Sequence, residues 1–295
     1  MKEVFLLDAD KEGREKMTDE ISRLDGYRGE MWVGKSIMGE PLAAYPVGDG
    51  EKIILLVGAH HGAEHITANL LFAFADFLLT EKSICGIDIP HLLHSFTFLI
   101  LPAVNPDGIE LSLHGPRQSP LLERQRVMCR GGDFTLWQSN ARGVDLNHNY
   151  DAGFAEYKRI ERETGICAGP TKYSGEYPES EPESRAVASL VRAIDPAAVV
   201  SLHTQGEEIF LSPREGGASD RVLRIARRLS LITGYKISEP CGTAVYGGLS
   251  DYTGALGIPS FTVECGRGTN PLSTSHIPHI FSRICPALVS LPTLL

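Results

Sequence analysis

The stretch Ile53-Ile54-Leu55-Leu56-Val57-Gly58-Ala59-His60-His61-Gly62-Ala63-Glu64 decides the fold of this chain. Its first five residues form an unbroken apolar run, which is typical of a strand that is buried on both faces. The apolar positions that follow have the spacing of one helix face, at Ile66, Leu70, Phe74, Phe77 and Leu78. We therefore predict that a central strand passes into a helix here, with the two histidines and the glutamate at the junction.

The same alternation of strand and helix continues along the chain. Apolar runs predict strands at 96–101, 197–202 and 258–263, and helical periodicity predicts helices at 180–195, 219–233 and 275–291. Ser180 and Glu183 have the spacing of a capping box at the start of the first of these helices. This order predicts an α/β protein whose mixed, mostly parallel sheet is flanked by helices.

No internal repeat or break in composition divides the chain, so we predict one domain over residues 1–295. A charged helix over 9–24 and a hairpin over 31–48 form an N-terminal extension, residues 1–48, that we expect to pack on it. The stretch 103–180 is rich in Gly, Pro and Arg, and we expect it to be irregular and to form the walls of a binding cleft rather than core.

Charge and composition exclude several classes of partner. The 28 basic and 37 acidic residues give a net charge of −9, which argues against a nucleic-acid partner. No segment approaches the ~18 apolar residues of a membrane span. The N-terminal sequence turns acidic at Asp8 before a secretion signal could form, and the six cysteines are scattered without a C-x-x-C pair. We therefore predict a cytoplasmic protein without a membrane partner; the oligomeric state is not predicted.

Three chemically active residues fall at the carboxyl ends of predicted strands: His61, His203 and Glu264. Ligands bind at such strand ends in open α/β sheets. A His-x-x-Glu pair, here His61 and Glu64, together with a distant histidine is the ligand set of a catalytic zinc site. His60 competes with His61 for this role, but it has the wrong spacing to Glu64 and points the other way by strand alternation. We predict one zinc ion, bound by His61, Glu64 and His203.

Five motifs in order give the chain a resemblance to a known family, the zinc metallocarboxypeptidases of the carboxypeptidase A type. They are Gly58-Ala59-His60-His61-Gly62-Ala63-Glu64, Asn105-Pro106-Asp107-Gly108, Gly143-Val144-Asp145-Leu146-Asn147-His148-Asn149-Tyr150-Asp151, Tyr173-Ser174-Gly175 followed by Ser201-Leu202-His203-Thr204, and Phe261-Thr262-Val263-Glu264. The resemblance implies a carboxypeptidase A-like fold and the same zinc ligands. It also implies Glu264 as the catalytic general base, Asp145 as the carboxylate that orients a ligand histidine, and Asn147 as a substrate-binding residue.

The chain differs from this family at positions that bind the substrate in the family. His148 stands where an arginine usually clamps the terminal carboxylate through two parallel hydrogen bonds, which histidine cannot form. Gln138 stands after Trp137 where a carbonyl-polarising arginine is expected, and Arg142 is close enough in sequence to replace it as a catalytic or substrate-binding residue. The family's mobile tyrosine has its nearest match in Tyr246, and Tyr252 is the next candidate. Arg267 is a further candidate for an anionic substrate group.

Asp145-Leu146-Asn147 and Glu264-Cys265-Gly266-Arg267-Gly268-Thr269-Asn270-Pro271-Leu272 resemble bacterial γ-D-glutamyl-diamino-acid peptidases more than digestive carboxypeptidases. The resemblance implies zinc-dependent hydrolysis of a peptide or isopeptide bond in small, peptidoglycan-derived peptides. Three alternatives stay open: a C-terminal carboxypeptidase of ordinary peptides, an aspartoacylase-like amide deacylase, and a non-catalytic zinc-binding protein.

Overall fold

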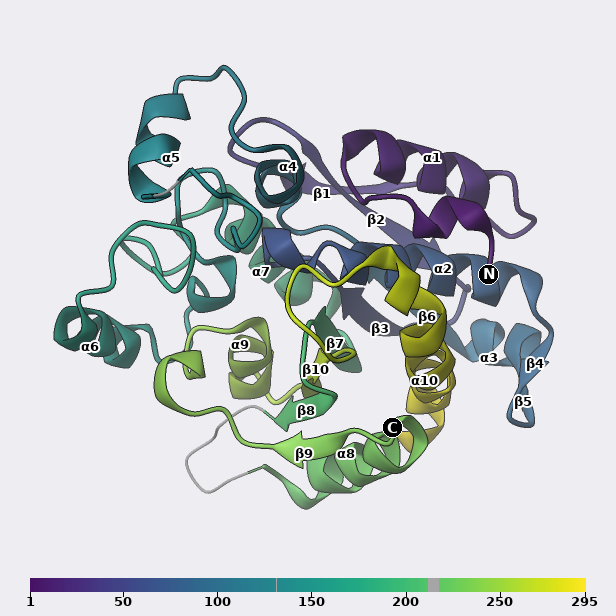
Figure 1. Ribbon diagram of the computed structural model, residues 1–295. Coiled ribbons are helices and arrows are strands. Elements are labelled where there is room, and N and C mark those ends of the chain that lie inside the picture. The colour runs from purple at the N-terminus through teal and green to yellow at the C-terminus, as the bar shows by residue number, and fades with distance from the viewer. Residues whose placement is uncertain (131, 212–217) are drawn as a thin grey trace.

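An eight-stranded sheet forms the centre of the protein (Figure 1). The computed structural model describes residues 1–130, 132–211 and 218–295. Across the sheet the strands are β1 (Met31–Lys35), β2 (Pro41–Val47), β6 (Phe96–Leu101), β3 (Lys52–Val57), β7 (Ala198–His203), β10 (Ser260–Glu264), β8 (Glu208–Leu211) and β9 (Lys236–Ser238). The central strands β6, β3, β7 and β10 run parallel, while β1–β2, β2–β6 and β10–β8 pair antiparallel. The predicted α/β class with a mixed sheet is confirmed.

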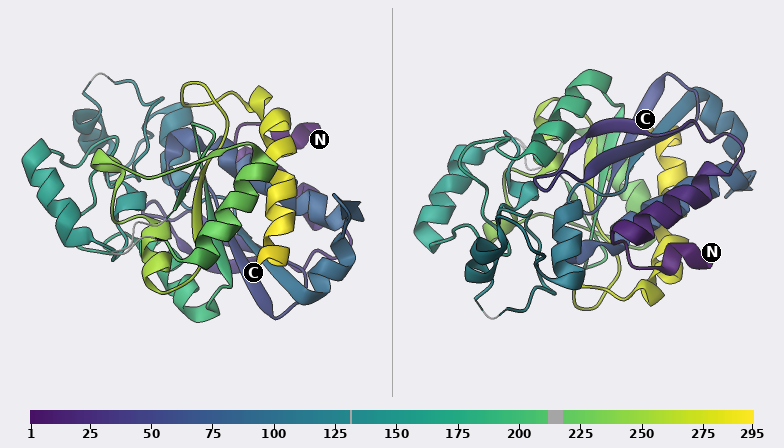
Figure 2. Two further views of the ribbon diagram at one scale, coloured as in Figure 1. Left: turned by 90° about the horizontal axis from the view of Figure 1, so that it is seen from below. Right: turned by 90° about the horizontal axis from the view of Figure 1, so that it is seen from above.

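Helices cover both faces of the sheet, as the two further views show (Figure 2). One face packs against α1 (Lys11–Ser22), α2 (Ile66–Thr80), α8 (Asp220–Thr233) and α10 (Ile277–Ser290). The other face packs against α7 (Pro182–Ile194) and α9 (Leu249–Ala255). Strand β3 serves both layers, because Ile54 and Leu56 enter the first core while Leu55 and Val57 enter the second. This two-sided burial is the reason for the unbroken apolar run at 53–57.

The first 48 residues are tied into the same structure. Strand β2 pairs antiparallel with β6, so the hairpin of β1 and β2 extends the main sheet. Helix α1 buries Met17 and Ile21 in the core that also holds α2. The short helix η1 (Glu3–Leu6) adds Phe5 to the same core.

The expectation that 103–180 is irregular and outside the core is wrong in part. The stretch contains α4 (Pro106–His114), α5 (Leu122–Met128), the short helix η3 (Leu146–His148) and α6 (Phe154–Thr164). Trp137, Tyr150 and Tyr157 within it are fully buried. Helices α4, α5 and η3 are short, and α4 begins after Asn105, whose side chain accepts a hydrogen bond from the Gly108 amide. Short segments of this kind give too weak a periodic pattern to be recognised in the sequence.

The predicted capping box at Ser180 is also wrong. Helix α7 begins at Pro182 after Glu181, and no side chain caps it. Ser180 instead donates a hydrogen bond to the Glu181 carboxylate. The remaining elements are η2 (Gly62–Glu64), β4 (Ser83–Ile84), β5 (Ile87–Asp88), α3 (Ile89–Ser95), η4 (Gly242–Ala244), η5 (Thr274–His276) and η6 (Leu291–Leu294). Among the described residues, none of the helices has the length and apolar character to cross a membrane.

Candidate metal centre

Neighbouring strands bring the predicted metal ligands to one edge of the sheet. His61 follows β3 and leads into η2, which ends at Glu64, while His203 is the last residue of β7. Because β3 and β7 pair in parallel, their carboxyl ends lie side by side. Gly62 allows this tight loop, since a Cβ atom there would lie 2.1 Å from the carbonyl oxygen of Gly108. Only glycine lets η2 approach the backbone of α4 this closely.

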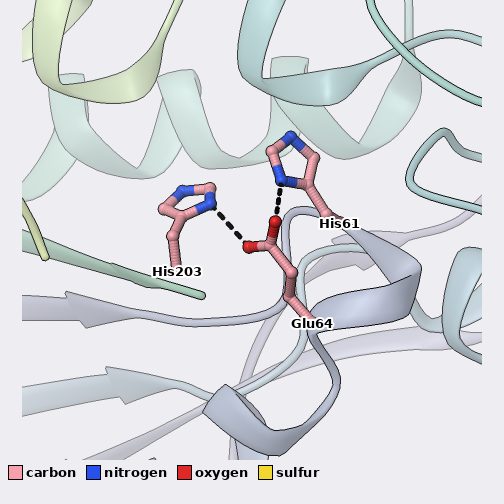
Figure 3. Close-up of side chains that lie close together, drawn as sticks. All are labelled: His61, Glu64 and His203. Atoms are coloured by element: carbon pink, nitrogen blue, oxygen red, sulfur yellow. Dashed lines mark hydrogen bonds and ion pairs between the residues drawn. The ribbon is translucent and has the colours of Figure 1, made fainter. Parts of the chain in front are cut away.

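The three side chains converge on one point, with Glu64 between the two imidazoles (Figure 3). Its Oε1 lies 2.8 Å from Nδ1 of His61, and its Oε2 lies 2.9 Å from Nδ1 of His203. One ligand atom from each residue lies within 4.8 Å of the others. Two imidazole nitrogens and a carboxylate are a zinc ligand set that leaves a position for water.

The electrostatics of this cluster favour a cation. Burial alone would raise the pKa of Glu64, but the His61 and His203 imidazoles outweigh it and lower that pKa to about 2. Burial opposes the charging of His61, yet the Glu64 and Asp145 carboxylates raise its pKa well above the usual value. The pocket therefore holds a carboxylate that requires positive charge beside it, and a divalent metal ion bound there would supply that charge.

Asp145 orients His61 from behind. Its Oδ1 lies 3.1 Å from Nε2 of His61, and its Oδ2 accepts a hydrogen bond of 2.8 Å from the amide of Lys172. This bond leaves Nδ1 of His61 as the atom that faces Glu64. A carboxylate on the far nitrogen of a ligand histidine fixes its tautomer and increases its basicity.

His203 contacts a hydroxyl group with its Nε2, where His61 contacts the Asp145 carboxylate. Its Nε2 lies 3.1 Å from Oγ of Ser201. His60, the competitor to His61 in the sequence, is not part of the ligand cluster. It lies fully buried beside His203, and the two ring centroids are 5.6 Å apart.

A cleft of about 140 Å³ opens beside the ligands. It brings together six of the predicted site residues: His61, Asn147, His148, His203, Tyr246 and Glu264. No lysine or arginine is among the described residues that line it, and its two carboxylates are Glu264 and Asp251.

The two arginines that the sequence predicts for the site have partners outside the cleft. Arg142 does not line the cleft; its Nε and Nη2 lie 2.9 and 2.8 Å from Oε2 of the buried Glu181. Arg267 is largely exposed and forms an ion pair of 2.9 Å with Glu207. Tyr252, the second tyrosine candidate, is buried and accepts a hydrogen bond from Arg192 rather than facing the cleft.

Gln138 does reach the metal centre. Its Nε2 lies 3.5 Å from Oε1 of Glu64, and its Oε1 accepts a hydrogen bond from the hydroxyl of Thr171. The Thr171 bond fixes the orientation of the amide. The NH₂ end of Gln138 therefore faces the ligands.

His148 is held in a neutral form. Its Nδ1 donates to the main-chain oxygen of Tyr246 at 2.8 Å, and its ring stacks on Tyr157 with centroids 4.1 Å apart. Burial lowers the pKa of His148. At neutral pH the ring therefore offers the cleft the unprotonated Nε2, which is a hydrogen-bond acceptor.

Sequence reasoning missed three polar residues of the cleft: Ser250, Asp251 and Thr262. The Oγ atoms of Ser250 and Thr262 are 2.7 Å apart, and Asp251 accepts a hydrogen bond of 3.1 Å from the amide of Gly248. Burial raises the pKa of Asp251 to about 6. One signal was available, because Thr262 precedes Glu264 by two residues on a predicted strand and so shares its face.

Comparison with known proteins agrees with this geometry. A relative, γ-D-glutamyl-L-diamino acid endopeptidase 1 of Lysinibacillus sphaericus, is 32% identical over 262 residues, which are 84% of this chain and 63% of that protein. Carboxypeptidase E of Caenorhabditis elegans is 35% identical over 138 residues, 43% of this chain and 27% of its own. This chain thus spans less than two thirds of the length of either relative.

Two solved structures share the fold. Thrombin-activatable fibrinolysis inhibitor superposes with a TM-score of 0.70 at 21% identity, covering 96% of this chain and 72% of its own. Murein-tripeptide amidase MpaA of Escherichia coli O157 superposes with a TM-score of 0.56 at 22% identity, covering 88% and 91%.

The family assignment rests on a match to a sequence model of a whole family. The sequence model of the zinc carboxypeptidases matches residues 29–280, a span that includes every ligand of the metal centre and Glu264. The predicted zinc cofactor is confirmed by this match together with the ligand triad. With most of its length and its metal ligands accounted for in this way, the chain belongs to the zinc carboxypeptidase family.

Proposed function

We propose that this protein hydrolyses the bond between γ-D-glutamate and a diamino acid in small peptides derived from peptidoglycan. The observation that carries the proposal is the acidic lining of the cleft, which has the carboxyl groups of Glu264 and Asp251 and no lysine or arginine among the described residues that line it. The name of the Lysinibacillus relative supports the same substrate class. The cytoplasm as the place of this reaction stays a prediction.

The chemistry that the ligand triad would supply with its metal bound is activation of a water molecule and polarisation of the scissile carbonyl. Glu264 is the base in this proposal: it takes a proton from the attacking water and delivers it to the leaving amine. Burial and the nearby Glu64 carboxylate raise the pKa of Glu264 well above its ordinary value. A raised pKa suits a carboxyl group that must both accept and return a proton.

Gln138 takes the role of the missing arginine in stabilising the developing oxyanion. Its NH₂ group faces the ligands, and Thr171 holds the amide in that orientation. A side-chain amide can fill this role, since removal of one such donor typically costs ~10²–10³ in turnover. Arg142 takes no part in this step, because it pairs with Glu181 and does not line the cleft.

The environment of His148 favours an amine over a terminal carboxylate as the substrate's recognition group. The neutral ring presents an acceptor nitrogen, which pairs with an N–H donor and repels a carboxylate. Asp251, whose pKa is about 6, adds negative charge to the same cleft at neutral pH. A diamino acid carries the additional amine that such a cleft would bind, and Asn147 and Tyr246 are the further contacts we propose for it.

The proposal is tested with a peptide panel: γ-D-glutamyl-diaminopimelate, γ-D-glutamyl-lysine, and ordinary dipeptides with a free C-terminus. We expect release of the diamino acid from the first two, loss of this activity with a zinc chelator, and its return with added zinc. Glu264→Gln is the matched control, because it keeps the metal ligands. Cleavage of the ordinary dipeptides alone would show a carboxypeptidase. A zinc-loaded protein that hydrolyses none of these amides would refute the proposal.

A further inference from the structure

His60 is a buried polar residue that the mechanism above leaves without a role. It precedes the ligand His61 in the chain but lies against the other ligand histidine, His203. The two rings are nearly parallel, with 19° between their planes and 5.6 Å between their centroids. Its side chain is fully inaccessible, so its two nitrogens must find hydrogen-bond partners inside the protein.

Both partners exist, and together they connect His60 to the metal centre. Nδ1 of His60 lies 3.4 Å from Oγ of Ser201, which itself lies 3.1 Å from Nε2 of His203. Nε2 of His60 lies 2.9 Å from the hydroxyl of Tyr150. Ser201 can join the two histidines because it stands two residues before His203 on β7 and so shares its face of the sheet.

Metal binding sets the direction of the first hydrogen bond in this series. Nδ1 of His203 points at Glu64, and it must be unprotonated to bind a metal ion. Nε2 of His203 then carries the proton and donates a hydrogen bond to Oγ of Ser201. With its oxygen accepting from His203, the Ser201 hydroxyl is free to donate to Nδ1 of His60, and in the tautomer that accepts this bond Nε2–H of His60 donates to Tyr150. Each proton in the series has one acceptor.

We propose that His60 is a positioning residue that fixes the tautomer and ring orientation of His203 through Ser201, and so strengthens zinc binding. His61 receives the same support from the carboxylate of Asp145. His203 has a hydroxyl at that position, and a hydroxyl rotates freely unless an acceptor holds its own proton. His60 provides that acceptor. The role concerns the metal alone, so it holds whichever peptide the cleft takes.

The test measures the zinc dissociation constant by competition with a chromophoric chelator at fixed pH. Loss of an outer partner of a metal ligand typically weakens binding by ~10–100-fold. We expect His60→Leu and Ser201→Ala each to weaken zinc binding by about 10-fold or more. Because both substitutions break one series of bonds, the double variant should bind zinc no more weakly than Ser201→Ala alone.

Two further variants separate this role from packing. In His60→Asn the amide oxygen stands near the position of Nδ1 and can accept from Ser201, so zinc affinity should return to within about threefold of the native protein. His65→Leu is the matched control. His65 is also buried and adjacent to a ligand, but none of its hydrogen bonds in the described structure reaches Ser201, so its loss should leave zinc affinity unchanged.

Cobalt substitution gives a readout that is independent of hydrolysis. The visible spectrum of bound Co²⁺ should change in His60→Leu and resemble the native spectrum in His60→Asn. Native zinc affinity in a folded His60→Leu protein, or additive effects of His60→Leu and Ser201→Ala, would overturn the proposal. If His60→Leu does not fold, Ser201→Ala decides, since unchanged zinc affinity in that variant equally excludes the role.

Discussion

Glu264 and His203 are register partners at the ends of the adjacent parallel strands β10 and β7. In parallel strands, residues at matched positions project to the same face. This pairing places a carboxyl group beside a metal ligand without any contribution from flexible loops. A slip of one residue in β10 would turn Glu264 to the opposite face.

Glu264→Gln should reduce hydrolysis by ~10² or more while the protein retains its zinc, because the amide cannot take a proton from water. Turnover on γ-D-glutamyl-lysine and metal content by atomic absorption check both parts. An active, zinc-loaded variant would remove Glu264 from the role of base.

His203→Ala should weaken zinc binding by more than the ~10–100-fold typical of outer partners, since it removes a ligand itself. Glu64 would lose the imidazole that lies 2.9 Å from its Oε2. Chelator competition measures the effect, with His65→Leu as a buried-histidine control. Unchanged retention of zinc would exclude His203 as a ligand.

Arg142→Ala should destabilise the fold by roughly 1–3 kcal/mol, because the buried Glu181 carboxylate loses its cation. Since the guanidinium does not line the cleft, we expect the turnover number to stay within about threefold of the native value. Chemical denaturation and steady-state kinetics separate these effects. A large loss of turnover at native stability would instead support the catalytic role suggested by the sequence.

His148→Arg should shift the substrate preference toward peptides with a free C-terminal carboxylate. A guanidinium supplies the paired donors that the neutral imidazole lacks. The measurement is the ratio of kcat/KM for an ordinary C-terminal dipeptide to that for γ-D-glutamyl-lysine, with His148→Gln as the uncharged control. A ratio that is equal in the Arg and Gln variants would contradict this prediction.

Glu183 should make the protein less stable as the pH rises. Burial raises the pKa of Glu183 from 4.5 to about 7, and its carboxyl group accepts bonds from the Ile37 amide and the Asn140 side chain. The folded state therefore holds this proton more tightly than the unfolded state. The stabilising contribution is complete below pH 4.5 and is lost as the pH passes 7, by up to ~3 kcal/mol.

Comparison with Glu183→Gln isolates the contribution of Glu183 to the pH dependence of stability, because the two proteins share all other titrating groups. The difference in unfolding free energy between the two proteins should change in favour of the glutamine variant from pH 5 to pH 8. A constant difference over that range would show that Glu183 ionises at an ordinary pKa.

The sequence predicts those parts of the site that lie on strong elements. The apolar run at 53–57 identifies a strand buried on both faces, and His203 and Glu264 follow similar runs. Because parallel strands share one carboxyl edge, their convergence could be expected before any side chain was placed.

The partners of individual side chains could not be predicted in the same way. Arg142 bonds to Glu181, which lies 39 residues further along the chain, and no local pattern distinguishes that contact from one with substrate. His60 is not part of the ligand cluster, and its hydrogen-bonded connection to His203 depends on Ser201 from another strand. Such contacts depend on tertiary packing, which periodicity and motif spacing do not report.

The pairing of β3 with β7 couples zinc binding to folding. His203 lies 139 residues after Glu64, and the unfolded chain does not hold the two together. An ion that binds only the assembled sheet stabilises it by mass action, by about 1.4 kcal/mol for each tenfold rise in free zinc above the dissociation constant. The concentration of available zinc around the protein therefore sets its resistance to unfolding and proteolysis as well as the fraction of molecules that carry the metal.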